Sequence, residues 1–164
     1  MPIRKHRPGG LVIEQTRDVA RVTAMLTAGG VIARGVEWPA ACYLMAYAGD
    51  EAVGVIGIES KIDAALVKSL FVAEQHRRHG IGARLIAAAR KAAHTRGARS
   101  LYLFAPPELG DYFRRFGFAE VASARLLESL AGVPEAEYYR ACPDVLAREV
   151  AFHLDISEDG VIRR

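Results

Sequence analysis

The chain has 164 residues, 51% of them hydrophobic and 25% charged, and a formal net charge of +3. A chain of this length fits one globular domain with its own core, and the composition argues against a disordered or fibrous protein. Lys and Arg exceed Asp and Glu by only 22 to 19, which is too little to predict nucleic-acid binding but would suit an anionic small ligand.

The first half of the chain predicts a strand, a helix and three further strands. The first strand is "LVIEQ" (11–15), and a helix follows over 16–28 with Gly29-Gly30 as its stop. Apolar runs lie on both sides of a polar turn at 48–51, and a third run, "AALVKSLFV", occupies 64–72. This pattern indicates an antiparallel meander over 43–72.

The second half alternates between helices and strands. Residues 82–97 are rich in helix formers and place one apolar stripe on a single face, made of Leu85, Ile86, Ala89, Ala92 and Ala93. After this helix come a strand in "RSLYLFA", a short helix in "LGDYFRRFGF", a strand within "AEVASARLL" and a last strand in "REVAFHLDI". No linker divides the chain, so we expect one domain over 11–158, a flexible basic tail at 1–10 and a flexible tail at 159–164.

Cysteine spacing and hydropathy exclude several classes. Cys42 and Cys142 lie far apart without metal-ligand spacing, so we expect neither a metal site nor a disulfide framework. His76 and His79 lack a third ligand and are better explained as part of a phosphate-binding loop. No apolar run is long enough for a signal peptide or a membrane span. We therefore expect a cytoplasmic protein with no membrane and no nucleic-acid partner.

The junction between the third strand of the meander and the next helix carries "QHRRHGIGARL" (75–85). A helix N-terminus presents unpaired N–H groups and a partial positive charge, so a glycine-rich loop leading into it can bind phosphate oxygens. Gly80 and Gly82 allow the backbone to approach an anion closely, and the neighbouring arginines add positive charge. The spacing fits neither the nucleoside-triphosphate loop nor the dinucleotide-binding fingerprint.

Two motifs resemble those of the GNAT superfamily of N-acetyltransferases. "RRHGIG" resembles its acetyl-coenzyme A signature, Gln/Arg-x-x-Gly-x-Gly/Ala after a strand, and "FRRFGF" resembles its aromatic-x-x-x-Gly-Phe helix end. Order and spacing agree over about Val53 to Val121. "ALVKSLFV", "RSLYLF", "YFRRFGF" and a downstream "CP" look most like the short branch related to N-acetylglutamate synthase and the arsenic-resistance acetyltransferases.

The resemblance implies a fold and a cofactor. The fold is α/β (α+β), with a mixed, mainly antiparallel central sheet of six to seven strands flanked by helices. The cofactor is acetyl-coenzyme A, held where the fourth strand splays from the fifth. The implied coenzyme site consists of the backbone of Leu70, Phe71 and Val72 for the acetyl carbonyl and pantetheine arm, the amides of Arg78, His79, Gly80, Ile81, Gly82 and Ala83 for the pyrophosphate, and the side chains of Arg77 and Phe113.

Two catalytic positions depart from the pattern of the family. Leu66 stands where many relatives have a glutamate base, and Phe113 stands where many have a tyrosine that protonates the leaving thiolate. Tyr112 lies about 100° away on a helix, so it replaces that hydroxyl only if the helix is rotated or the register shifts by one. Glu59, at the end of a strand, is the remaining candidate base through a water relay, or else a solvated strand end.

Three residues are candidates for binding the acceptor. Lys68 shares a strand face with Leu66, so it either binds a substrate carboxylate in the cleft or reaches solvent from an edge or bulge. Trp38, with Arg34 nearby, lies in the variable substrate loop implied by the resemblance. Tyr138-Tyr139 forms either a second wall of the acceptor site or a contact in a homodimer.

The resemblance therefore predicts an acyltransferase that acetylates the primary amine of a small molecule, such as an amino acid or analogue, by direct attack in a ternary complex. The missing base and acid keep open a non-catalytic acyl-coenzyme A sensor or regulatory module. A third alternative is a protein-lysine or N-terminal acetyltransferase, which needs a cleft open enough to admit a peptide.

Overall fold

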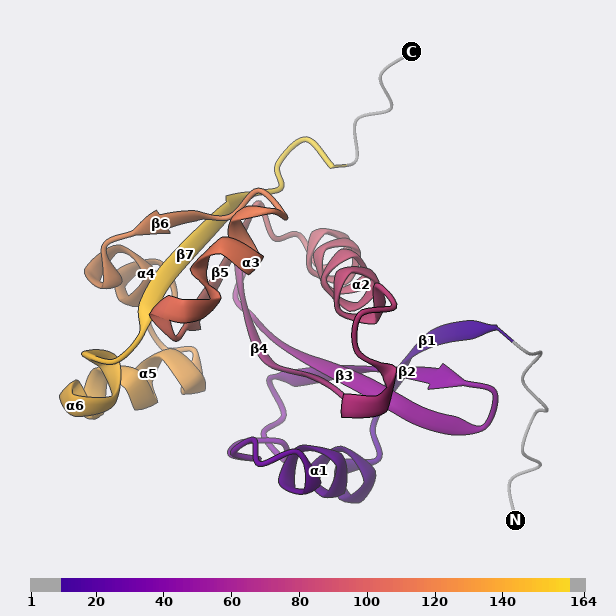
Figure 1. The fold of residues 1–164 in the computed structure, drawn as a ribbon. Coiled ribbons are helices and arrows are strands. Elements are labelled where there is room, and N and C mark those ends of the chain that lie inside the picture. The colour runs from indigo at the N-terminus through magenta and orange to yellow at the C-terminus, as the bar shows by residue number, and fades with distance from the viewer. Residues whose placement is uncertain (1–9, 160–164) are drawn as a thin grey trace.

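The computed structural model describes residues 10–159, in which seven strands form one sheet (Figure 1). The strands are β1 (Leu11–Thr16), β2 (Ala41–Ala48), β3 (Glu51–Ser60), β4 (Ala64–Val72), β5 (Ser100–Ala105), β6 (Ala119–Val121) and β7 (Val150–Asp155). Their order is β1-β2-β3-β4-β5-β7-β6, and every neighbouring pair is antiparallel except β4 and β5. The expected mixed, mainly antiparallel sheet is therefore confirmed. Most of the two expected tails, residues 1–9 and 160–164, lies outside the described residues.

Helices cover both faces of the sheet. They are α1 (Val19–Ala28), α2 (Ile81–Thr95), α3 (Gly110–Arg114), α4 (Ser123–Ser129), α5 (Pro134–Ala141) and α6 (Pro143–Leu146), with short 3-10 turns at η1 (Glu74–His76) and η2 (Pro107–Leu109). α2 packs on one face, whereas α1, α4 and α5 pack on the other (Figure 1). None of the helices within residues 10–159 is long and apolar enough to cross a membrane.

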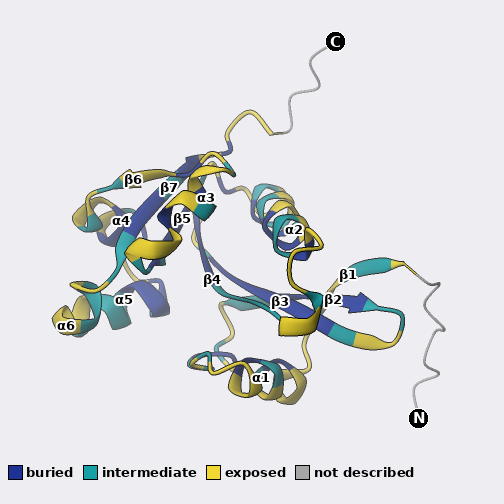
Figure 2. Cartoon of the chain, viewed as in Figure 1, coloured by how far each residue is buried: buried dark blue, intermediate teal, exposed yellow. Residues whose placement is uncertain are grey.

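The alternation of side chains along the strands sorts the core into these layers. In β2, Leu44 packs toward α2, while Tyr43 and Met45 pack toward α1. The buried stripe of α2 follows helical periodicity and matches the expected face, apart from half-buried Ala92; it consists of Ile81, Leu85, Ile86, Ala89 and Ala93. Figure 2 shows the central strands as the most deeply buried part of the chain.

The sheet opens between β4 and β5. These parallel strands pair only over three residues, Ala64–Leu66 against Ser100–Tyr102, and then diverge. Beyond that point β4 also carries a bulge, because Lys68 pairs with Gly57 whereas Phe71 already pairs with Val55. Ser69, inside the bulge, has a φ of 55°. The edge of β4 that faces β5 thus has no strand partner from Val67 onward, as the resemblance predicts.

The helices between β6 and β7 are the part of the fold that the sequence analysis missed. The strand expected within "AEVASARLL" is β6, only three residues long, and α4, which was not predicted, begins two residues after it. α5 and α6 have eight and four residues, and both begin at a proline, which suits the first turn of a helix. Helices this short carry little periodicity, and α4 and α5 are placed by the apolar cluster that they form with Leu66, Tyr102 and Ala151.

Candidate active site

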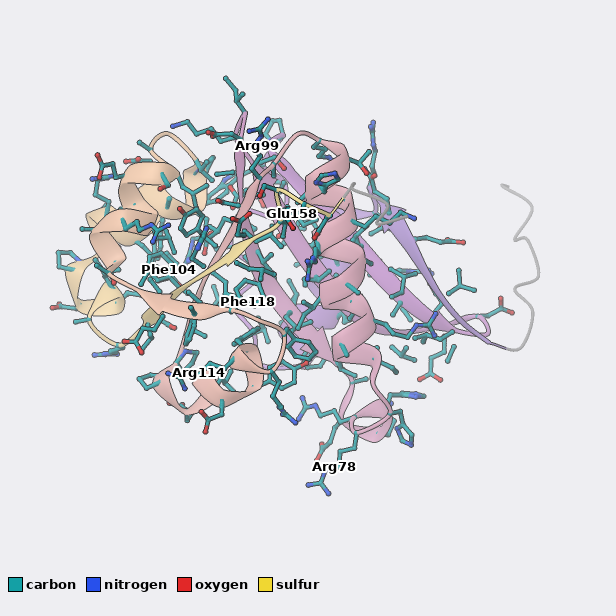
Figure 3. The ribbon with its side chains drawn as sticks, turned by 90° about the horizontal axis from the view of Figure 1, so that it is seen from above. Arg78, Arg99, Phe104, Arg114, Phe118 and Glu158 are labelled. Carbon is teal, nitrogen blue, oxygen red and sulfur yellow. The ribbon has the colours of Figure 1, made fainter. Side chains whose placement is uncertain are left out.

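The glycine-rich loop lies between the end of β4 and the start of α2. The chain turns through Arg78 and Gly80, whose φ angles of 65° and 76° are left-handed. Gly80 adopts this conformation without strain and is the residue before the first turn of α2, which contains no acidic side chain. Arg77 Nε donates a hydrogen bond of 2.9 Å to the Val72 carbonyl oxygen, so this arginine ties the loop to the strand. Arg78 projects from the loop into open space (Figure 3).

Gly82 and Tyr112 meet at the first turn of α2. A Cβ atom at Gly82 would lie only 2.3 Å from the Tyr112 hydroxyl oxygen, so the hydroxyl rests where a larger residue would place its side chain. Phe113 points instead into the core, where its ring packs near Phe118 and Phe152. The short helix α3 is therefore rotated so that Tyr112, and not Phe113, faces the glycine-rich loop.

The backbone around the loop fits the coenzyme that the sequence implies. Leu70, Phe71 and Val72 lie on the unpaired edge of β4, and the amides at Gly80 to Ala83 open the N-terminus of α2. A strand edge can bind an extended chain through backbone hydrogen bonds, and the amides can bind phosphate oxygens. Gly82, whose missing Cβ atom leaves room for the Tyr112 hydroxyl, lies among these amides.

A cluster of four charged side chains, three of them buried and Arg34 partly exposed, joins the sheet to α5. Lys68 Nζ lies 3.0 Å from Glu59 Oε2 and 3.6 Å from Glu135 Oε2. Arg34 Nη2 donates a hydrogen bond of 2.8 Å to Glu135 Oε1, and the Glu135 backbone N–H donates one of 3.3 Å to Glu59 Oε1. Glu59 is completely buried. With two cations and two carboxylates, the formal charges of the cluster cancel.

This cluster brings together Arg34 and Lys68, two of the residues expected to bind the acceptor, with Glu59. Trp38 lies beside them, its ring centroid 4.7 Å from Lys68 Nζ. Burial raises the pKa of the Glu59 carboxyl, and the charge of Glu135 adds to that rise, while Lys68 opposes it. Glu135 is the member that the sequence analysis missed. Its only local signal is its place just after Pro134, at the start of a helix too short to recognise from periodicity.

A cavity of about 290 Å³ opens beside the cluster, at the divergence of β4 and β5. Its lining includes Lys68 and Ser69 from β4, Phe104 from β5, Arg34 from the segment before β2, and Leu66, at the position where the resemblance implies a glutamate base. The C-terminal part of the chain supplies a second wall with Glu135, Tyr138, Tyr139, Val145 and Glu149. The Arg34 guanidinium lies 3.3 Å from the centroid of the Tyr138 ring. Glu59 lines neither this cavity nor the next.

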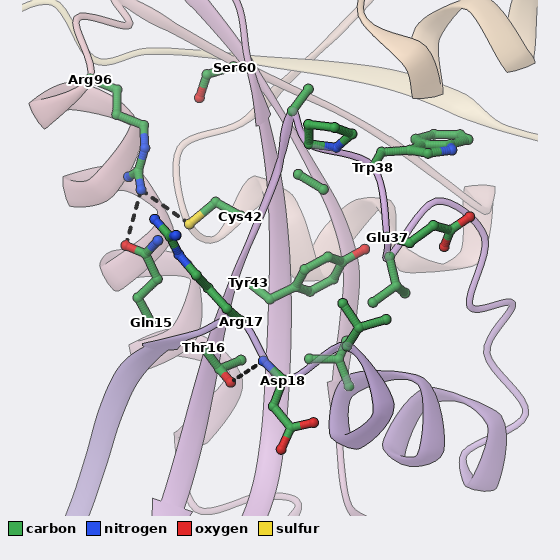
Figure 4. A pocket seen from close by; sticks show the side chains of 16 residues that line it. Gln15, Thr16, Arg17, Asp18, Glu37, Trp38, Cys42, Tyr43, Ser60 and Arg96 are labelled. Atoms are coloured by element: carbon green, nitrogen blue, oxygen red, sulfur yellow. Dashed lines mark hydrogen bonds between the residues drawn. The ribbon is translucent and has the colours of Figure 1, made fainter.

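A larger cavity, of about 550 Å³, lies at the other end of α2 (Figure 4). There Arg96 Nη2 donates to Gln15 Oε1 and to Cys42 Sγ, both at 3.2 Å. Burial raises the pKa of the Cys42 thiol, against the lowering effect of Arg96 and Arg17. Because α2 has 15 residues and rises about 1.5 Å per residue, Arg96 in the lining of this cavity lies about 20 Å from the glycine-rich loop. The smaller cavity is therefore the one that adjoins the coenzyme-binding geometry.

The described residues agree with known families in sequence and in fold. A family model described as acetyltransferase (GNAT) domain matches residues 39–120, half of the chain. No curated protein matches the sequence.

Several solved structures share the fold at low sequence identity. N-acetylglutamate synthase from Neisseria gonorrhoeae, solved with coenzyme A and N-acetyl-glutamate, gives a TM-score of 0.67 at 16% identity over 92% of this chain and 36% of that one. Rv2747 from Mycobacterium tuberculosis, solved with coenzyme A, gives 0.66 at 14% identity over 88% and 98%. An aminoglycoside 6'-N-acetyltransferase, also with coenzyme A, gives 0.62 at 15% identity over 93% and 99%. The chain spans only about a third of the length of the synthase.

Proposed function

This chain belongs to the GNAT family of acetyltransferases and is therefore an acyltransferase that uses acetyl-coenzyme A, and we propose that its acceptor is the primary amine of a small molecule. The observation that carries the proposal is the cavity at the divergence of β4 and β5. It adjoins the unpaired edge of β4 and has walls from β4, β5, α5 and the segment before β2. A cavity of about 290 Å³ suits a small amine better than a folded protein substrate.

Holding the coenzyme is the task of β4 and the start of α2. Leu70 to Val72 would bind the acetyl and pantetheine parts through the backbone, and the amides at Gly80 to Ala83 would bind the pyrophosphate. Bound acetyl-coenzyme A supplies the thioester that an amine attacks. The guanidinium of Arg78, which is exposed to solvent, adds positive charge near the phosphates.

Tyr112 is our candidate for the acid that protonates the leaving thiolate. Its hydroxyl lies where a Cβ atom of residue 82 would be, and burial raises the pKa of the phenol, with Arg115 opposing the rise. The phenol therefore keeps its proton throughout the neutral pH range and can donate it. Glu59 remains a candidate base, but because it is buried beneath Lys68 it can act only through Lys68, Glu135 or a water relay.

An amino acid or an analogue is our proposed acceptor class. Arg34 supports this class, because its Nε is buried in the described structure without a hydrogen-bond partner and the residue lines the cavity. Such a donor suits a carboxylate oxygen. The ammonium of Lys68 has two carboxylates nearby, so its binding of a substrate carboxylate requires Glu135 to move or to take up a proton.

Thiol release from acetyl-coenzyme A tests the proposal. The purified protein is assayed with the standard amino acids, amino-acid analogues, a polyamine and a lysine-containing peptide. We expect turnover with an amino acid or an analogue, and Arg34→Gln should raise its KM more than that of an amine without a carboxylate. Turnover of the peptide alone would contradict a small-molecule acceptor, and equal KM effects would contradict the carboxylate role of Arg34.

A further inference from the structure

The charges that line the acceptor cavity are paired with one exception. Arg34 pairs with Glu135, and Lys68 pairs with Glu59 behind it. Glu149, in the turn before β7, also lines the cavity, and within residues 10–159 it forms no ion pair. Its Oε2 is buried without a hydrogen-bond partner. A carboxylate oxygen that is shielded from water and has no partner destabilises the fold. We therefore expect a hydrogen-bond donor of a ligand to pair with this oxygen.

Strand register places Glu149 near the reacting end of the coenzyme. Leu66 of β4 is level with Tyr102 of β5, so the β4 bulge at Ser69 comes level with the end of β5, near Ala105. Ala105 pairs with Val150 of β7, and Glu149 precedes it. The carboxylate therefore lies at the height of the bulge, where the edge that we expect to hold the acetyl group begins.

Glu149 also lies on the correct face of the sheet. Side chains two residues apart share a strand face, and Ala151 packs in the cluster formed with α4 and α5. Glu149 points to the same side, as do Lys68 and Phe104, which also line the cavity. Glu149 directly precedes the last pair of the β5–β7 ladder, Ala105 with Val150.

Aromatic rings complete the surroundings of a cation at this point. The rings of Phe104 and Tyr139 lie with centroids 4.2 Å apart and planes tilted by 34°, and both residues line the cavity. Glu149 is close enough to Tyr139 to raise the pKa of its phenol, after the larger effect of burial. Ring faces attract ammonium groups, and a neighbouring carboxylate strengthens that attraction.

We propose that Glu149 receives the ammonium group of the acceptor and takes its proton. This inference rests on the proposed N-acetyltransferase function and names the base that serves it. The acceptor R–NH3+ gives one proton to the Glu149 carboxylate, and the freed nitrogen lone pair forms the C–N bond at the acetyl carbon while the C–S bond breaks. The thiolate takes a proton from the Tyr112 hydroxyl. The nitrogen then loses a second proton, which returns to the Tyr112 oxygen, and Glu149 releases to solvent the proton that it took from the ammonium.

The surroundings of Glu149 suit a base that works near neutral pH. Burial raises the pKa of its carboxyl, and the negative charge of Glu108 in η2 adds to the rise. Tyr139 faces it from α5, and the other charged groups in the cavity are Glu135, Arg34 and Lys68, which pair as described above. Since the base must be ionised, kcat/KM should fall as the pH drops through a pKa higher than that of an ordinary glutamate.

The pH profile of kcat/KM for the best amine acceptor tests the inference. Glu149→Gln should lower kcat by about 100-fold or more and remove the acidic limb, while coenzyme A binding by calorimetry and the melting temperature stay close to wild type. Added formate should restore part of the turnover of Glu149→Ala. Glu108→Gln is the matched control: it should keep kcat and move the acidic limb to lower pH, because it removes a repulsion.

Each outcome separates this inference from the proposed function. If wild type turns over an amine and Glu149→Gln keeps both its kcat and its acidic limb, the inference is wrong while the proposed function stands. Loss of the limb in Glu59→Gln and not in Glu149→Gln would assign the proton to Glu59 instead. If wild type releases thiol with none of the amines, the proposed function fails and the inference fails with it.

Discussion

At the scale of single residues, Gly82 sets the distance between α2 and Tyr112. Gly82→Val should weaken acetyl-coenzyme A binding by about 2 kcal/mol, or roughly 30-fold in Kd, because the side chain must displace the Tyr112 hydroxyl and cover the amides of the first turn. Calorimetry measures the change. Ala87→Val, at an exposed position of the same helix, adds the same β-branched side chain and should leave Kd unchanged. If Gly82→Val and wild type bind acetyl-coenzyme A with equal affinity, the coenzyme does not bind at this turn.

Tyr112 carries the second prediction at this scale. Tyr112→Phe should lower kcat by about 10-fold or more and leave the coenzyme Kd nearly unchanged, because only the proton donor is lost. Tyr102→Phe is the control: it removes a hydroxyl that bonds Ser129 Oγ at 3.0 Å, away from the cavity. The comparison is made by steady-state thiol release. An unchanged kcat in Tyr112→Phe would mean that solvent protonates the thiolate.

At the scale of elements, the charged cluster holds β3, β4 and α5 together through Lys68. Lys68→Met leaves Glu59 without its nearest cation, so the pKa of Glu59, already raised by burial, should rise further in the folded protein. The folded variant then holds a proton that the unfolded chain has released, and its free energy of unfolding falls as the pH rises above the pKa of an unfolded glutamate.

We expect a loss of about 3 kcal/mol at pH 8 and a smaller loss at pH 5, measured by urea unfolding. Lys61→Met, at an exposed lysine in the turn before β4, should lose little at either pH. Adding Glu59→Gln to Lys68→Met should recover part of the loss. Equal losses at the two pH values would mean that packing, and not charge, explains the effect.

Local pattern explains which elements the sequence predicted. The meander and α2 have strong periodicity and clear turns, so their type and order were confirmed. The glycine-rich loop lies between β4 and α2 as expected, and its binding of the coenzyme stays a prediction. α5 is too short to show a pattern, and Glu135 is buried by contacts with residues far away in the sequence. The rotation of α3, which decides between Tyr112 and Phe113, depends on packing against Phe118 and Phe152. The periodicity of the sequence predicts neither the burial of Glu135 nor the rotation of α3.

At the scale of the whole molecule, a ligand in the opening between β4 and β5 should stabilise the fold. Coenzyme A at 100 times its Kd should add about 2.7 kcal/mol to the free energy of unfolding, which corresponds to a rise of about 5 to 10 °C in melting temperature. Gly82→Val at the same concentration should show a smaller rise. Scanning calorimetry makes the measurement, and the absence of a rise in the melting temperature of wild type would contradict coenzyme binding.

A homodimer and a cytoplasmic location stay predictions from the sequence.

Because β4 and β5 pair over only three residues, the sheet consists of two parts that diverge beyond this pairing. The first part, β1 to β4 with α2, carries the donor side. Phe104, Tyr139 and Glu149, on the acceptor side, belong to the second part, which contains β5 to β7. Much of that second side comes from the continuous segment between β6 and β7, beyond the residues that the family model matches. A chimera carrying the segment of another acetyltransferase should therefore change its preferred amine while it keeps its donor.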